Sequence, residues 1–69
     1  MKVKVYLEQK DKEEIVNLDN NSNIKSLLEK LKINSGTVIT ANSNNELVTD
    51  NYVIKNNERI KIIPVISGG

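Results

Sequence analysis

The sequence predicts an α+β fold in which a sheet of four to five strands carries one helix on one of its faces. Apolar and polar residues alternate near the start of the chain, and a single segment shows helical periodicity. Aliphatic residues supply almost the whole core, with nine Ile, seven Val and six Leu beside two Tyr and no Phe or Trp. Because one helix with one apolar stripe covers one face of a sheet, we expect the other face to meet solvent.

The first two strands are expected to form a hairpin. Residues 2–8 alternate strictly between aliphatic side chains and polar or aromatic ones, which is the period of a half-buried strand. After a polar turn, residues 14–19 resume the pattern with Ile15 and Leu18 as the expected core positions, although Val16 interrupts the alternation. Two such segments joined by a short turn predict a hairpin.

The helix is expected to begin after Ser22 or Asn23, because either side chain can accept a hydrogen bond from the first free backbone N–H groups. Four apolar residues then recur at helical spacing: Ile24, Leu27, Leu28 and Leu31. We interpret this stripe as core packing against the sheet rather than as a groove for a partner. Gly36 is expected to end the segment with a positive φ angle.

The second half of the chain supplies the remaining strands. Residues 37–41 are rich in β-branched side chains, residues 46–48 predict a short strand, and residues 58–66 form the most apolar stretch, expected to be a central strand. Asn-rich segments at 42–45 and 56–57 predict turns, because Asn tolerates the left-handed backbone region. The solvent-facing side of the sheet should then carry Lys4, Tyr6, Lys61 and Ile63.

Composition excludes several classes of function. Without Cys or His, the chain has no disulfide framework, thiolate metal site or cysteine nucleophile, and it lacks the commonest general base. Ten Lys and Arg are interleaved with nine Asp and Glu, which predicts no footprint for nucleic acid or an anionic membrane. No apolar run approaches the about 18 residues of a membrane span, and the alternating start is unlike a leader peptide. We therefore expect a cytoplasmic protein that is not an enzyme and holds no metal.

The C-terminus is the feature that points to a function. Two of the three glycines in the chain, Gly68 and Gly69, are its last two residues. Without Cβ atoms they form a thin segment that can enter a narrow channel. An ionised carboxylate is a poor electrophile, so it needs activation, for example by an adenylyl group from ATP, before a thiol, persulfide or amine can attack it. A frayed terminus or an end introduced by cloning are the alternatives.

Pro64 is expected to mark the point where the last strand ends, because it cannot donate to the hydrogen-bond ladder. The residues after it would leave the sheet as an exposed arm. We accordingly assign residues 1–66 to a single domain and residues 67–69 to an exposed Ser-Gly-Gly tail.

Residues 60–69, with the sequence IKIIPVISGG, resemble the end of the small ubiquitin-like sulfur carriers, which include the ThiS and MoaD proteins and their archaeal modifier relatives. The resemblance extends to the first strand, to residues 24–28 and to the hairpin at 38–48. It implies the β-grasp fold, a mixed sheet whose first and last strands pair in parallel at the centre. Asn57 stands where the family usually has Gly before an acidic residue, a departure that affects turn geometry only.

The resemblance implies a carrier in which an E1-like enzyme, using ATP, adenylates the carboxylate of Gly69, which is then converted to a thiocarboxylate. The carrier itself would bind no cofactor. The enzyme would grip the tail residues Pro64, Val65, Ile66, Ser67 and Gly68, and a docking face is expected at Ile63 and Lys61.

The implied partners are a sulfur donor and a downstream synthase or tRNA thiolase, serving thiamine, molybdopterin or tRNA thiolation. The same activated end could also be attached to lysines of target proteins, as in a ubiquitin-like modifier. A different class of function stays open: a non-catalytic interaction module that binds through its outer sheet face and whose tail is incidental.

Overall fold

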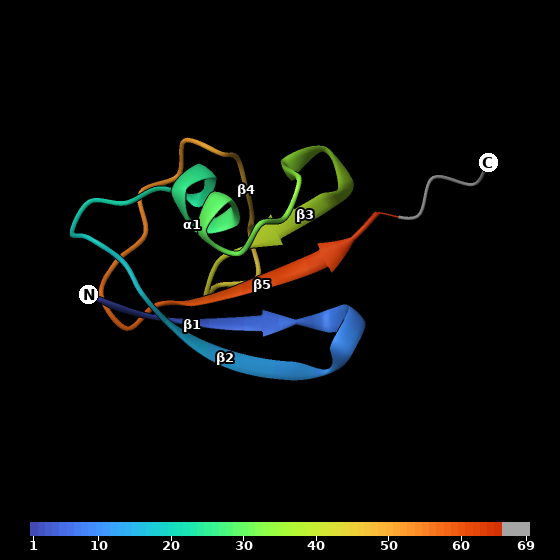
Figure 1. The fold of residues 1–69 in the computed structure, drawn as a ribbon, viewed down its shortest axis with the longest axis horizontal. Helices are drawn as coiled ribbons and strands as arrows, with labels where there is room; N and C mark the ends of the chain where they lie inside the picture. The colour runs from blue at the N-terminus through green and yellow to red at the C-terminus, as the bar shows by residue number, and fades with distance from the viewer. Residues whose placement is uncertain (66–69) are drawn as a thin grey trace.

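In the computed structural model, which describes residues 1–65, one α-helix lies across one face of a five-stranded sheet (Figure 1). The elements follow in the order β1 (Lys2–Leu7), η1 (Glu8–Lys10), β2 (Lys12–Asn17), α1 (Ile24–Lys30), η2 (Ser35–Thr37), β3 (Val38–Ala41), β4 (Leu47–Val48) and β5 (Arg59–Pro64), where η marks a 3₁₀ turn. No helix within this part of the chain is long and apolar enough to cross a membrane.

The strand order β2-β1-β5-β3-β4 puts the last strand in the middle of the sheet. β1 and β5 run parallel, from the pair Lys4 and Arg59 to the pair Leu7 and Ile62, and the other neighbouring strands are antiparallel. The expected α+β fold with a mixed sheet, parallel at its centre, is therefore confirmed as a β-grasp arrangement. β5 runs through the middle of the sheet, between β1 and β3, as far as Pro64 (Figure 1).

The first hairpin is confirmed, but its second strand has a different inward face from the one expected. Ile15 pairs with Lys4 and is 65% exposed, whereas Val16 and Leu18 are buried. The expectation that Ile15 belongs to the core is wrong because residues three apart in a strand point to opposite faces. The strand also begins earlier, at Lys12, because the turn before it is short.

Helix α1 begins as expected. The side chain of Asn23 accepts a hydrogen bond from the backbone N–H of Ser26 at 2.9 Å, so Asn23 rather than Ser22 is the cap. Ile24 and Leu27 are fully buried under the helix, which confirms that the apolar stripe packs on the sheet.

The end of α1 differs from the expectation. The N–H of Lys32 donates to the carbonyl of Glu29 and the N–H of Ile33 to that of Leu28, at 3.1 and 2.9 Å, which is the Schellman pattern. Lys32 adopts the left-handed conformation, with φ 59°, and Gly36 has no positive φ. The prediction for Gly36 is therefore wrong, because the helix closes four residues earlier and leaves Gly36 within η2.

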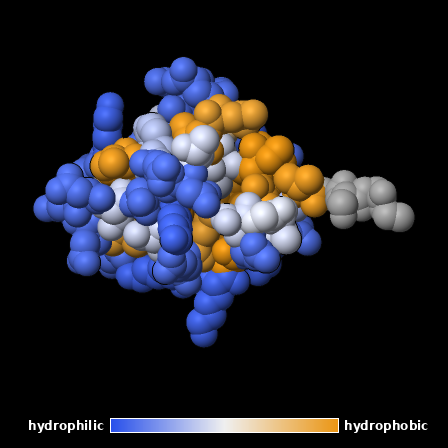
Figure 2. All heavy atoms as spheres, turned by 90° about the horizontal axis from the view of Figure 1, so that it is seen from above, coloured by the Kyte–Doolittle hydropathy of each residue, from blue (hydrophilic) through white to orange (hydrophobic). Residues whose placement is uncertain are grey.

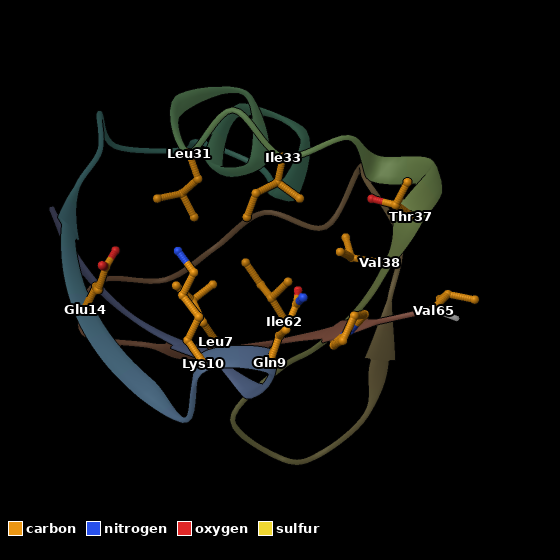
Figure 3. Close-up of a pocket in the computed structure, with 11 residues that line it drawn as sticks. Leu7, Gln9, Lys10, Glu14, Leu31, Ile33, Thr37, Val38, Ile62 and Val65 are labelled. Carbon is orange, nitrogen blue, oxygen red and sulfur yellow. The ribbon is translucent and has the colours of Figure 1, made fainter. Parts of the chain in front are cut away.

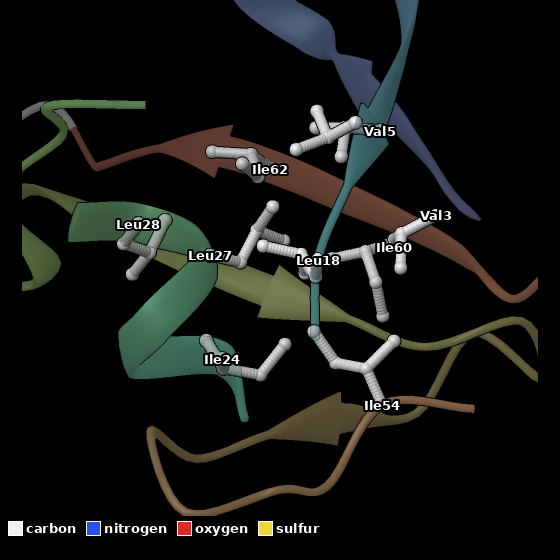
Figure 4. Close-up of a cluster of buried hydrophobic side chains, with 10 residues drawn as sticks. Val3, Val5, Leu18, Ile24, Leu27, Leu28, Ile54, Ile60 and Ile62 are labelled. Carbon is white, nitrogen blue, oxygen red and sulfur yellow. The ribbon is translucent and has the colours of Figure 1, made fainter. Parts of the chain in front are cut away.

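The core lies between α1 and the inner face of the sheet, with contributions from the loop before β5 (Figure 4). Its members come from every layer of the fold: Val3, Val5, Val16, Leu18, Ile24, Leu27, Leu28, Ile54, Ile60 and Ile62. Full burial of one such side chain contributes about 1.5 to 3 kcal/mol. In so small a domain, the burial of each of these side chains is a substantial share of the total stability.

The Asn-rich turns also match the expectation. Asn45 and Asn57 have φ angles of 62° and 65°, which are the left-handed values that glycine usually supplies. The N–H of Asn57 donates to the carbonyl of Lys2 at 2.7 Å and so joins the turn before β5 to the start of β1. Asn at this position therefore preserves the turn geometry that the resemblance associates with Gly.

Candidate functional site

The base of the C-terminal tail is hydrogen-bonded to the residue that directly precedes β3. β5 ends at Pro64, which pairs with Val38, and the N–H of Val65 donates to the carbonyl of Thr37 at 2.9 Å. The strand is therefore shorter than the expected 58–66, and Pro64 is its last residue, where its lack of an N–H does least harm. Val65 is 45% exposed.

The turn that receives Val65 is itself held by short-range hydrogen bonds. The side chain of Asn34 accepts from the N–H of Gly36 at 2.9 Å, and the backbone carbonyl of Asn34 accepts from both the N–H and the hydroxyl of Thr37, at 3.0 and 2.7 Å. These bonds define the position of η2. The carbonyl of Thr37 is thereby presented to the chain at the point where it leaves the sheet.

The predicted tail residues divide between those that the structure places and those outside the described residues. Pro64 and Val65 lie at the exit from β5. Four further predicted residues lie outside the described part of the chain: Ile66, Ser67, Gly68 and Gly69.

The two residues expected to form a docking face lie side by side along the outer face of β5. Ile60 and Ile62 are buried beneath α1, so the strand alternation places Lys61 and Ile63 on the opposite face, and both are half-buried. A row of side chains on this face therefore runs along β5 toward the tail.

Apolar side chains flank Ile63 across the sheet. Ile39 pairs with Ile63, and Leu47 lies on the same face because it pairs with Ala41, the partner of Lys61. Ile39 and Leu47 are 40% and 69% exposed. We name Ile39, Leu47 and Ile63 the outer apolar patch. The sequence analysis missed Ile39 and Leu47 because only strand pairing shows that they share a face with Ile63.

A polar hollow of about 410 Å³ adjoins this patch on the outer face. Its lining consists of Tyr6, Asn42, Ser43, Asn45, Arg59 and Lys61, and we name it the cationic cleft. The guanidinium carbon of Arg59 lies 5.4 Å from the centroid of the Tyr6 ring and the ammonium of Lys61 lies 5.9 Å from it. Two cations thus share one aromatic ring, at distances where cation–π attraction operates.

Acidic groups border the cationic cleft, among them Glu46, whose carboxylate accepts a hydrogen bond from the side chain of Asn42 at 3.3 Å. The guanidinium of Arg59 lies 3.5 Å from the carboxylate of Glu13, and the hydroxyl of Tyr6 donates to Asp11. That hydrogen bond, followed by desolvation, raises the pKa of Tyr6 above its usual value of 10.0. Tyr6 therefore stays neutral at physiological pH, and the charge within the cleft is positive.

A second hollow, of about 490 Å³, opens beside the base of the tail. Leu31 and Ile33 reach into it from the end of α1, and Leu7, Val38 and Ile62 face them from the sheet (Figure 3). Figure 2 shows hydrophobic side chains gathered on the surface on this side of the molecule. We name this hollow the tail-base cleft. Sequence reasoning did not find it, and the only signal was Ile33, an apolar residue just beyond the helix.

The tail-base cleft includes Lys10 and Glu14 in its lining, and the cationic cleft includes Tyr6 and Lys61. Within residues 1–65 there is no group of three or more His, Cys, Asp or Glu side chains that could hold a metal ion.

Comparison with known proteins bears on this arrangement. A family model described as the ThiS family matches residues 3–69, a range that includes the sheet, the helix and the whole tail. No curated protein matches the chain.

Proposed function

The chain belongs to the ThiS family, and we propose on this basis that it is a protein-based sulfur carrier whose reactive group is the carboxylate of Gly69. The observation that carries the proposal is the family match, because it continues through the final residue of the sequence. The hydrogen bond from Val65 to Thr37 supports it, because it holds the last described residue at the end of β5 beside a well-packed domain.

The chemistry proceeds in steps that a partner enzyme catalyses. The carboxylate oxygen of Gly69 attacks the α-phosphorus of ATP, an acyl adenylate forms and pyrophosphate leaves. A persulfide on a sulfur donor then attacks the acyl carbon and AMP leaves. A second thiol cleaves the resulting S–S bond, which produces a disulfide on the donor side and the thiocarboxylate on Gly69. The carrier contributes the acyl group and no catalytic side chain, and it holds no cofactor of its own.

The E1-like enzyme is proposed to grip the segment from Pro64 to Gly68 and to cover the outer face of the sheet. Ile63 and Lys61 lie on that face directly before the tail, and the exposed apolar side chains of Ile39 and Leu47 extend it. Apolar patches of this kind on small proteins are typical of protein contacts. A sulfur donor and a downstream synthase or tRNA thiolase would use the charged carrier in turn.

We propose that the carrier serves thiamine synthesis, molybdopterin synthesis or tRNA thiolation, and that it does so in the cytoplasm. The same acyl adenylate can react with a lysine amine, so attachment to target proteins is a further use of Gly69. The exposed outer apolar patch also fits a second candidate, an interaction module that needs no tail chemistry.

Intact mass spectrometry of the untagged protein isolated from its own cells tests the proposal. A fraction of the molecules should carry sulfur in place of one C-terminal oxygen, and ATP–pyrophosphate exchange should occur with the adenylating enzyme of the same cells. Deletion of Gly68 and Gly69 should abolish both signals while leaving the folded domain intact. A terminus that is always a free carboxylate, with no exchange, would instead support the interaction module.

A further inference from the structure

We infer that the cationic cleft receives a carboxylate side chain, Asp or Glu, from the adenylating enzyme that covers the outer face of the sheet. The inference rests on the proposed function and adds to it the chemistry by which the enzyme recognises this face. The cleft is lined by two cations, one aromatic ring and three small polar side chains, with no acidic residue among them.

The charges in the cleft are only partly compensated. Arg59 has Glu13 at 3.5 Å, but both side chains of this pair are about half exposed, so the pair is weak and readily exchanged. Lys61 has no ion-pair partner among residues 1–65. Cation–π contact with Tyr6 brings the two cations to one ring, which raises the local positive potential. A carboxylate placed between them would meet complementary charge on two sides.

Hydrogen bonds hold the walls of the cleft in fixed positions, so the cleft can bind a carboxylate in one defined place. The hydroxyl of Ser43 accepts from the N–H of Arg59 at 3.0 Å and joins the β3–β4 turn to β5. The side-chain oxygen of Asn42 accepts from the N–H groups of Asn44 and Glu46, at 2.9 and 3.0 Å, and closes the same turn. The cleft therefore lies between the β3–β4 turn and β5, which are hydrogen-bonded to each other.

The location of the cleft favours a protein carboxylate over a free anion. Lys61 is followed on the same face by Ile63, and Ile39 and Leu47 lie alongside, so the cationic cleft is continuous with the outer apolar patch. At about 3.3 Å per residue, the four steps along the chain from Lys61 to Val65 span about 13 Å. One protein surface that grips the tail can thus reach the cleft across the apolar patch, with an acidic side chain at its far border.

Kinetics of ATP–pyrophosphate exchange with the cognate adenylating enzyme test the inference. The double variant Arg59→Gln with Lys61→Gln should raise the KM for the carrier about tenfold or more and leave kcat nearly unchanged, because the tail itself is intact. The loss should shrink as salt is added. The matched control, Lys25→Gln with Lys32→Gln, removes the same charge from exposed positions on the helix side and should leave the KM within about twofold.

A second variant changes the KM in the opposite direction. Glu13→Gln removes the carboxylate that competes for Arg59, and it should lower the KM about two- to threefold. Lys61→Arg preserves the charge and should stay close to the wild-type protein.

Three outcomes would overturn the inference. The first is an unchanged KM in the Arg59 and Lys61 double variant, and the second is an equal loss in the helix-side control. The third is saturable binding of inorganic phosphate or ATP to the free carrier, detected as NMR shifts confined to the cleft, since it would identify a site for a free anion. Exchange that is absent with the wild-type protein contradicts the proposed function itself, so the two failures are distinguishable.

Discussion

The N–H of Val65 donates to the carbonyl of Thr37 at 2.9 Å, so the chain remains bound to the sheet one residue beyond the last residue of β5. Although its side chain is 45% exposed, the amide of Val65 should exchange with solvent more slowly than an unstructured amide. Hydrogen exchange followed by NMR checks this. Asn34→Ala removes the cap of η2 and should reduce the protection of the Val65 amide from exchange. If this amide exchanges freely in the wild-type protein, the hydrogen bond to Thr37 is contradicted.

Replacement of Lys32 by glycine should stabilise the domain. Lys32 has a φ of 59°. This left-handed conformation strains any residue that has a Cβ atom, and glycine avoids that strain. Lys32→Gly should raise the free energy of unfolding by about 0.5 to 1 kcal/mol in urea denaturation. The control is Lys25→Gly, which places glycine inside α1 and should destabilise by about 1 kcal/mol. Equal effects of the two changes would exclude the Schellman ending.

Loss of the helix cap should weaken the fold measurably. Asn23 accepts from the N–H of Ser26, and Asn23→Ala should lower the free energy of unfolding by about 1 kcal/mol. Asn23→Asp keeps an acceptor oxygen and should retain most of the stability. A loss of the same size in both variants would show that the side-chain acceptor does not matter.

Truncation in the core should be far more costly than truncation on the outer face. Leu27 is fully buried, and Leu27→Ala should cost about 2 to 5 kcal/mol, enough to unfold much of so small a domain. Leu47 is 69% exposed, and Leu47→Ala should change stability by no more than about 0.5 kcal/mol. Urea midpoints measured at one temperature compare the two, and similar midpoints would contradict the assigned core.

Both tyrosines should titrate above the usual tyrosine range. The hydroxyl of Tyr52 donates to Glu58 at 2.6 Å, and this hydrogen bond, followed by desolvation, raises the pKa of Tyr52 above 10.0. When ionisation is followed by the ultraviolet absorbance of tyrosinate, both titration midpoints should therefore lie at a higher pH than that of an ordinary tyrosine. Glu58→Gln should move that of Tyr52 back toward the usual value, whereas Tyr6, which is bonded to Asp11, should not move.

The same hydrogen bonds make stability depend on pH in the alkaline range. Because the folded protein holds the tyrosine protons more tightly than the unfolded chain does, this contribution is complete below about pH 10. It is lost as the pH rises from there through the raised pKa values. Tyr52→Phe should make the alkaline loss less steep, and an identical pH profile would contradict a folded-state shift at Tyr52.

Much of the fold follows from local patterns. The alternation in residues 2–8, the stripe beginning at Ile24 and the Asn cap are confirmed because each depends on a short-range period or a single hydrogen bond. Ile15 and Gly36 were predicted wrongly for the opposite reason. The burial of Ile15 depends on which face of β2 packs against the helix. The backbone conformation of Gly36 depends on where hydrogen bonds end the helix. A short stretch of sequence determines neither.

The sequence by itself determined the strand and helix periods, the absence of Cys and His chemistry, and the Gly-Gly end that points to a carrier. The resemblance implied the central place of β5, but only the tertiary structure showed that Arg59 and Lys61 come to the ring of Tyr6 and that Ile63 comes to Ile39. Pairing between strands far apart in the chain is set by the burial of one shared core. For that reason the surfaces beside the tail could be described only from the folded protein.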